Sequence, residues 1–304
     1  MRKVLEQVNM PLAGVALGVA ALGNIPGLNL PPLRLLCAAI AAALLMLLLA
    51  KTLLLPRAMR QALQDPVAAS VAPTAAMALM LLAAYMQPLS AVAAVGMWWC
   101  GVALHLALML NYTQLVLKQR RPELLHASTF VVYVGIAAAA VSSALVSTGP
   151  LNVELPGQIL ALWGLVCFIA LLPLLLYRYL KYPVPPPARP LFCIFAAPAA
   201  LCLVALINAA PVLSLLLLRQ LLWLSWLLYI PALVNAIICL RGPFYPSFAA
   251  LTFPFVISAT ATLRAVWMAG LPLIFYRIGQ LQAAIAVVLV TYVLLRSLWA
   301  LKPQ

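Results

Sequence analysis

Charged side chains, and acidic ones above all, are scarce in this sequence. Only 7% of the 304 residues are charged, and the acidic ones are Glu6, Asp65, Glu123 and Glu154. A soluble domain carries about 25% charged residues because its surface must be hydrated, so a separate aqueous domain is excluded. All four carboxylates fall at or near the expected loops. Cation transport and proton pumping usually place Asp or Glu within the membrane, so the sequence argues against both.

Motifs for catalysis and metal binding are also missing. The six cysteines stand singly within apolar runs, and no C-x-x-C pair occurs. They are typical of small packing residues, so neither a disulfide nor a metal site is expected. No D-x-x-x-D, H-x-x-x-H or G-x-S-x-G arrangement is present, which argues against a membrane-embedded enzyme. We therefore expect no catalytic activity and no cofactor.

Apolar residues make up 67% of the chain, and its mean hydropathy is +1.15. A helix of about 20 apolar residues crosses the hydrocarbon core of a bilayer. The sequence predicts an all-α membrane protein, a single transmembrane domain over residues 1–304 with ten spans. The expected spans lie near 9–24, 32–54, 67–86, 88–113, 127–148, 155–180, 189–208, 212–240, 246–269 and 274–299.

The net charge of +14 is distributed unevenly along the chain. Basic residues occur in ones to threes in short gaps, with no basic domain, so we expect no nucleic-acid partner. With ten spans, fourteen of the eighteen Lys and Arg residues fall on the side of the two termini. The positive-inside rule then predicts a multi-pass protein of the cell membrane with both termini in the cytoplasm. The basic residues that fall elsewhere are Arg34, Arg219, Arg264 and Arg277.

Successive spans pair into five helical hairpins that begin near residues 9, 67, 127, 189 and 246, a nearly constant period. Proline inside a helix removes a hydrogen bond and kinks the axis. We interpret the pattern as five kinked odd-numbered helices in a quasi-fivefold arrangement around a central pore, with the even-numbered helices outside. Alternatively, Pro and Gly are simply common in membrane helices. The helix-weakening residues are Gly14 (with Pro11 and Gly18), Pro73, Gly135, Pro198 and Pro254.

Four segments rich in small residues stand out: PLAGVALGVAALGN (11–24), DPVAASVAPTAAMALMLLA (65–83), STFVVYVGIAAAAVSSA (128–144) and FYPSFAALTFPFVISATA (244–261). Together they resemble the tellurite-resistance/dicarboxylate transporter family, which includes the bacterial TehA-type channels and the plant slow-type anion channels. The resemblance implies a homotrimer with one pore per protomer, lined by the odd-numbered helices and blocked midway by a phenylalanine. The family pattern falls on Thr252-Phe253-Pro254, which makes Phe253 the expected gate.

Polar and basic residues supply the remaining pore candidates. Thr74, Ser142 and Thr260 either replace part of an anion's hydration shell or bond to carbonyls of their own helices. Thr260 shares the helix face of Phe253, whereas Ser258 lies opposite. Arg264 and Arg277 either attract anions at the outer mouth or extend to lipid headgroups.

These observations predict a passive conductor of small anions such as chloride and nitrate. Relatives in the family conduct such anions, carry malate and other dicarboxylates, or export sulfite. A dicarboxylate carrier needs basic residues near the bilayer midplane, and the odd-numbered helices have none there. A carrier for C4-dicarboxylates or sulfite, or a scaffold without transport activity, remains an alternative.

Overall fold

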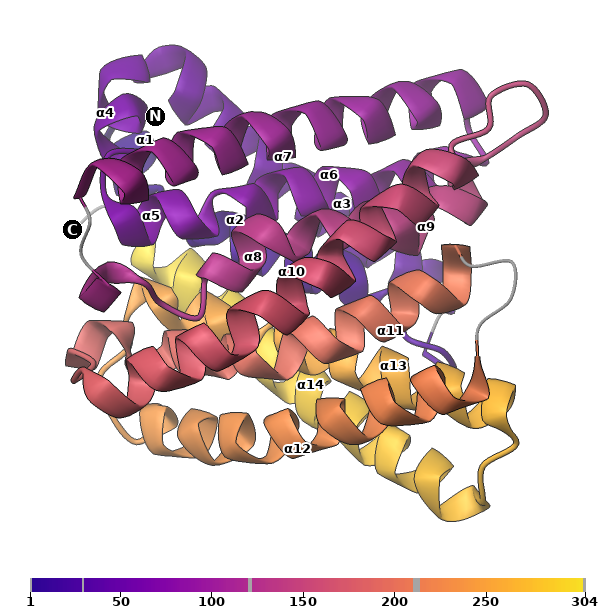
Figure 1. Cartoon of the computed structure of the whole chain (residues 1–304). Helices are drawn as coiled ribbons and strands as arrows, with labels where there is room; N and C mark the ends of the chain where they lie inside the picture. Colours follow the sequence, from indigo (N-terminus) through magenta and orange to yellow (C-terminus); the bar gives the residue numbers. More distant parts are fainter. Residues whose placement is uncertain (1, 29, 120–121, 210–213, 303–304) are drawn as a thin grey trace.

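The computed structural model describes residues 2–28, 30–119, 122–209 and 214–302 of the chain (Figure 1). Its helices lie side by side between two ends of the molecule, and both termini lie at one of them, which we name the terminal end; the opposite one is the far end. The elements are α1 Arg2–Gln7, α2 Leu12–Leu22, α3 Pro31–Leu54, α4 Pro56–Ala62, α5 Pro66–Val71, α6 Pro73–Met86, α7 Ala91–Gln119, η1 Pro122–Leu124, α8 Thr129–Tyr133, η2 Gly135–Ala137, α9 Ala138–Val146, α10 Glu154–Lys181, η3 Pro186–Ala196, α11 Ala197–Ala209, α12 Leu215–Leu240, η4 Pro246–Leu251, α13 Phe253–Ala269 and α14 Leu273–Ala300.

Within the described residues, eight helical stretches are long and apolar enough to cross a membrane. They correspond to every expected span except the first and the fifth. There the structure has shorter apolar helices, Leu12–Leu22 and Gly135–Val146. The expected first span, 9–24, is therefore an 11-residue helix with turns at both ends. The start of the eighth expected span, 212–240, lies partly outside the described residues, and its helix begins at Leu215.

Helix burial separates the spans into two groups. The apolar windows of three odd-numbered spans, Pro66–Met86, Pro186–Ala209 and Pro246–Ala269, are 78–94% buried. Those of the five even-numbered spans, α3, α7, α10, α12 and α14, are only 22–39% buried. Every residue of the short helix α2 is also buried. The odd-numbered spans are therefore enclosed by protein, and the even-numbered spans form the outer surface.

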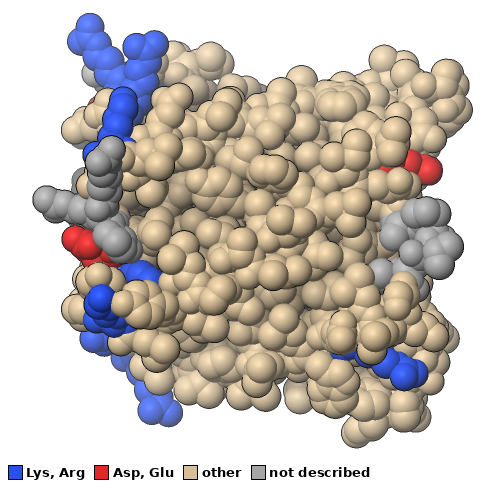
Figure 2. Space-filling view, viewed as in Figure 1, with Lys and Arg blue, Asp and Glu red and all other residues tan. Residues whose placement is uncertain are grey.

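The outer surface is apolar between the two ends of the molecule (Figure 2). Leu, Ile, Val and Trp side chains of the even-numbered spans are exposed on this surface. Charged side chains gather at the ends, and most of the visible Lys and Arg lie at the terminal end. Lipid is the solvent that such a surface fits, because an apolar face of this extent is unfavourable in water.

The expected proline kinks are wrong in detail. A proline kinks a helix only when it stands inside a continuous helix, but Pro73 and Pro254 stand in the first turns of α6 and α13. Pro198 stands likewise in the first turn of α11. Proline fits this position because the first amides of a helix have no helical partner to lose. Gly135 begins the 3-10 turn η2, and Gly14 lies within the regular helix α2. Most of the inner spans are thus pairs of segments joined at a break.

Side-chain donors satisfy backbone carbonyls near these breaks. The Thr252 hydroxyl lies 3.0 Å from the Gly14 carbonyl and 2.7 Å from that of Ala249. The indole of Trp98 donates to the Ala139 carbonyl at 3.0 Å, and His105 Nε2 lies 2.9 Å from the Val132 carbonyl. Each bond supplies a partner that water cannot supply within a bilayer.

The contact between α2 and the break at Thr252 depends on a glycine. A Cβ atom on Gly18 would lie 2.5 Å from the Thr252 Cβ and 3.1 Å from the Phe253 backbone nitrogen. Both distances are shorter than ordinary van der Waals contact. Gly18 therefore lets the first inner helix approach the segment that carries Phe253.

We expect Gly18→Ala to lower the melting temperature of the detergent-solubilised protein, because overpacking a buried contact typically costs about 1–3 kcal/mol. Gly96→Ala on α7 is the matched control, since no atom lies within 4 Å of a Cβ at that position. Alanine there favours the helix by up to about 1 kcal/mol. Equal melting temperatures for the two variants would contradict the assignment of a close contact at Gly18.

Candidate functional site

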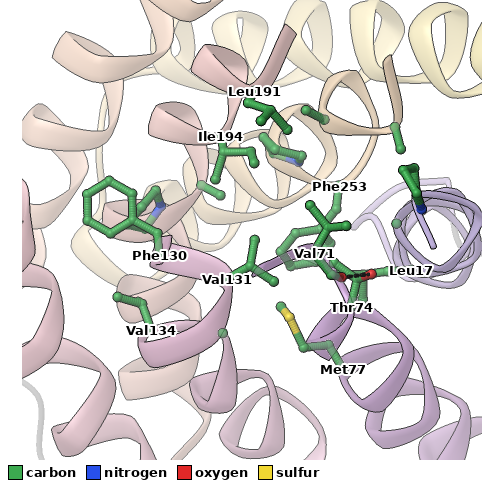
Figure 3. A pocket seen from close by; sticks show the side chains of 18 of the residues that line it. Leu17, Val71, Thr74, Met77, Phe130, Val131, Val134, Leu191, Ile194 and Phe253 are labelled. Carbon is green, nitrogen blue, oxygen red and sulfur yellow. Dashed lines mark hydrogen bonds between the residues drawn. The ribbon is translucent and has the colours of Figure 1, made fainter. Parts of the chain in front are cut away.

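An apolar cavity, which we name the central cavity, lies where the five inner segments meet (Figure 3). Its volume is about 70 Å³, and among its described lining residues only Thr74 and Ser247 have polar side chains. The Thr74 hydroxyl donates to the Val71 carbonyl at 2.7 Å, and that of Ser247 donates to the Pro187 carbonyl. The residues that line it are Pro11, Gly14, Leu17, Val67, Val71, Thr74, Met77, Phe130, Val131, Val134, Gly135, Leu191, Ile194, Ala197, Pro198, Leu201, Ser247, Ala249, Ala250, Phe253 and Pro254.

A second cavity of about 190 Å³, which we name the far cavity, is more polar. Two guanidinium groups, an amide and two hydroxyls reach its lining. Residues from α2, α3, α6, α9 and α13 line it, so it lies beyond the breaks, toward the far end. They are Ala21, Asn24, Arg34, Leu81, Ala84, Ala138, Val141, Ser142, Leu145, Phe253, Ile257, Thr260 and Arg264.

Phe253 belongs to the linings of both cavities, and no other described residue does. Its side chain is 6% exposed. The phenylalanine is the first residue of α13, directly after the break at Thr252, where the Thr252 hydroxyl lies 3.0 Å from the Gly14 carbonyl of α2. The geometry places one aromatic ring between two cavities.

The structure brings most of the predicted site residues to one of these cavities. Gly14, Thr74, Gly135, Pro198 and Pro254 line the central cavity, together with Phe253. Ser142, Thr260 and Arg264 line the far cavity. Pro73 is absent from both linings and instead begins α6, one residue before Thr74.

Arg277 does not join Arg264. Its side chain is exposed on α14 and donates to Gln280 Oε1 at 3.0 Å. It belongs to neither cavity lining. The two arginines that the sequence suggested for a common outer mouth therefore lie in different surroundings.

Three hydroxyl groups of the site donate to carbonyls that lie three or four residues earlier in the chain. Ser142 donates to the Ala139 carbonyl at 3.3 Å and Thr260 to the Val256 carbonyl at 2.9 Å. Thr74 follows the same pattern. Because each hydroxyl has a single hydrogen, these groups present only acceptor lone pairs to the cavities.

Arg34 is the site residue that the sequence did not single out. Its guanidinium lies in the far-cavity lining, with Cζ 4.9 Å from the centre of the Tyr85 ring. The available signal was its place among the few basic residues remote from the terminal end. Of the other three, Arg264 also reaches the cavity, whereas Arg219 and Arg277 are exposed.

Two buried basic residues lie at the terminal end: His126, outside the spans, and Arg178, in the last turn of α10. His126 stands in the connection between η1 and α8, and its Nδ1 has no hydrogen-bond partner. Arg178 is 3% exposed and donates to the Glu123 carbonyl at 2.6 Å. Burial, and then the nearby Arg178 charge, lower the pKa of His126 to about 4, although Asp65 opposes the shift. His126 is therefore neutral at physiological pH.

These features define a multi-pass helical membrane protein with two interior cavities separated by an aromatic ring. A model of the SLAC1 family, described as voltage-dependent anion channels, matches residues 7–298, and the chain belongs to this family. The match confirms the family resemblance drawn from the sequence. It also confirms, at the level of the family, a membrane anion channel or transporter. No curated protein matches the chain.

The lowered pKa of His126 predicts how the stability of the protein depends on pH. Its folded-state pKa of about 4 lies below the ordinary value of 6.5. Between these values the unfolded chain binds more protons than the folded one, so stability falls as pH decreases. We expect the melting temperature of the detergent-solubilised wild type to fall more steeply from pH 7 to pH 4.5 than that of His126→Gln. Parallel pH profiles would show that His126 does not contribute to the loss.

Proposed function

We propose that the protein conducts small monovalent anions, such as chloride and nitrate, along a path that passes through both cavities. The observation that carries the proposal is the position of Phe253 in the two linings. A path between the cavities has to pass this ring, so Phe253 is the gate. The ring closes the path by blocking it and by keeping the narrow part dry.

The properties of the central cavity indicate that the proposed path is closed in this structure. Its volume of about 70 Å³ would admit a few water molecules, but its lining offers almost no polar partners. Apolar cavities of this kind stay empty of water. An anion entering it would lose its hydration without compensating hydrogen bonds, which is strongly unfavourable. Rotation or displacement of Phe253 would widen the path and let water accompany the ion.

The charges near the path favour anions over cations. Arg34 and Arg264 line the far cavity, and neither lining contains Asp or Glu among the described residues. A fixed positive potential in a cleft raises the local concentration of anions and excludes cations. The described lining of the central cavity has no cationic group, so nothing there would hold an anion long enough to stop its flow.

The proposal includes the arrangement of the molecule in the membrane. The ten helical stretches form five hairpins around a quasi-fivefold pore, and the five inner segments that line the central cavity support this arrangement. The terminal end faces the cytoplasm, because most of the visible basic residues gather there. The family resemblance adds a homotrimer, which light scattering of the purified protein would measure.

Removing the ring should open the path. We expect Phe253→Ala to raise single-protein anion conductance in planar bilayers by about tenfold, a barrier lowered by about 1.4 kcal/mol. Phe253→Leu should give a smaller increase. Phe255→Leu is the matched control, because Phe255 packs against Tyr229 with ring centres 5.4 Å apart and lines neither cavity. An unchanged conductance in Phe253→Ala would rule out the gate.

Flux measurements should separate the candidate functions. We expect proteoliposomes to release chloride and nitrate faster than malate or sulfite, without saturation at millimolar concentrations. Saturable exchange of malate or sulfite would instead indicate a carrier. Absence of flux for every anion, in both wild type and Phe253→Ala, would indicate a scaffold.

A further inference from the structure

We propose that the far cavity binds a planar oxyanion between Arg34 and Arg264, and that this site makes the protein prefer nitrate and small carboxylates to chloride. The inference deepens the proposed function, because it names the class of anion that the path recognises. Binding at the site does not itself require conduction, so the two ideas can be tested separately.

Two positive groups share one cavity although they come from separate helices. Arg34 stands in the first turn of α3, and Arg264 lies near the end of α13. Both line the far cavity, whose described lining contains no carboxylate. Like charges that face one space repel each other, and an anion between them converts this repulsion into attraction. The cavity is therefore built to favour an anionic occupant.

Arg34 is held in a fixed orientation. Its guanidinium stacks on the Tyr85 ring, and the Tyr85 hydroxyl donates to the Ala20 carbonyl at 2.6 Å. Gly23 makes room for this hydroxyl, since a Cβ there would lie 2.6 Å from it. The Nε atom of Arg34 is buried and has no hydrogen-bond partner among the described residues. Because a buried donor without a partner is unfavourable, a bound acceptor would stabilise the arrangement.

Arg264 is oriented by contacts of a different kind. One of its Nη atoms donates to Asn208 Oδ1, and Asn208 Nδ2 donates to the Val141 carbonyl at 2.7 Å. This relay ties the guanidinium of α13 to α11 and α9. A guanidinium carries five N–H donors, so the bond to Asn208 leaves donors for a ligand.

The donors of the site match an oxyanion better than a halide. The hydroxyls of Ser142 and Thr260 already donate to backbone carbonyls, so the guanidinium groups are the main donors. Two N–H groups of a guanidinium fit two oxygens of a planar anion in a bidentate manner. A spherical halide accepts the same donors without this geometric match. The volume of about 190 Å³ accommodates nitrate or a small carboxylate with accompanying water.

The distance between this site and the gate, Phe253, allows the site to concentrate anions near the narrow part of the path. Arg264 follows Phe253 by eleven residues, which is about 16 Å along a helix. An anion held there is concentrated near the entrance of the narrow part without being trapped inside it. Selection and gating are thus assigned to different places on the same helix, α13.

Two readouts test the site. In detergent, nitrate should raise the melting temperature of the wild type more than chloride does at equal ionic strength. In planar bilayers, the nitrate-to-chloride permeability ratio should exceed one. We expect Arg34→Gln/Arg264→Gln to abolish the nitrate-specific stabilisation and to lower the ratio several-fold. Arg34→Lys/Arg264→Lys keeps the charge without the planar fork, so it should retain anion selectivity over cations but lose most of the nitrate preference.

Arg277→Gln and Arg219→Gln are the matched controls, because both residues are exposed and lie outside the two linings. They should change neither readout. A nitrate preference that survives in both double variants would overturn the inference and leave the proposed conduction intact. Nitrate-specific stabilisation that depends on the two arginines, in a protein without any anion flux, would support the binding site and overturn the conduction.

Discussion

The requirement that every backbone polar group find a partner inside the protein governs this structure, because the bilayer core offers no water to replace a missing one. The inner spans are broken, and the breaks are stabilised by groups such as the Thr252 hydroxyl and the Trp98 indole. Without water as a partner, the hydroxyls of Thr74, Ser142 and Thr260 likewise donate to backbone carbonyls three or four residues earlier in the chain. The cavities are consequently poor in hydroxyl donors. Guanidinium groups become the main hydrogen-bond donors that an anion can meet.

Hydropathy and turn residues predicted the helices well where a span is long and regular. The tenth expected span, 274–299, differs by one residue at each end from the observed helix α14, Leu273–Ala300. The first expected span was too long, because residues 9–11 and 23–24 lie outside the helix, before Leu12 and after Leu22. The helix breaks were located but misinterpreted as kinks. Composition alone does not tell a proline within a helix from one that begins its second segment.

The site was predictable to the extent that it follows helical periodicity. Residues of α13 such as Phe253 and Thr260 share a face, and both line the far cavity. Arg34 could not be assigned in the same way, because its inward direction depends on Tyr85, which lies about fifty residues away on another span. Arg277 and Arg264 looked equivalent as basic residues near the same end. Their difference arises from which face of each helix packs inward, and that is a property of the assembled bundle.

The bond between Thr252 and the Gly14 carbonyl joins residues 238 positions apart. The wall of the central cavity to which α2 contributes is therefore complete only when the last hairpin packs against α2. The segment that completes the wall also carries the Phe253 ring. During biosynthesis, the proposed path is therefore incomplete until the last hairpin has been inserted. On the proposed assignment of Phe253 as the gate, one helix therefore brings both the last wall of the path and the ring that closes it.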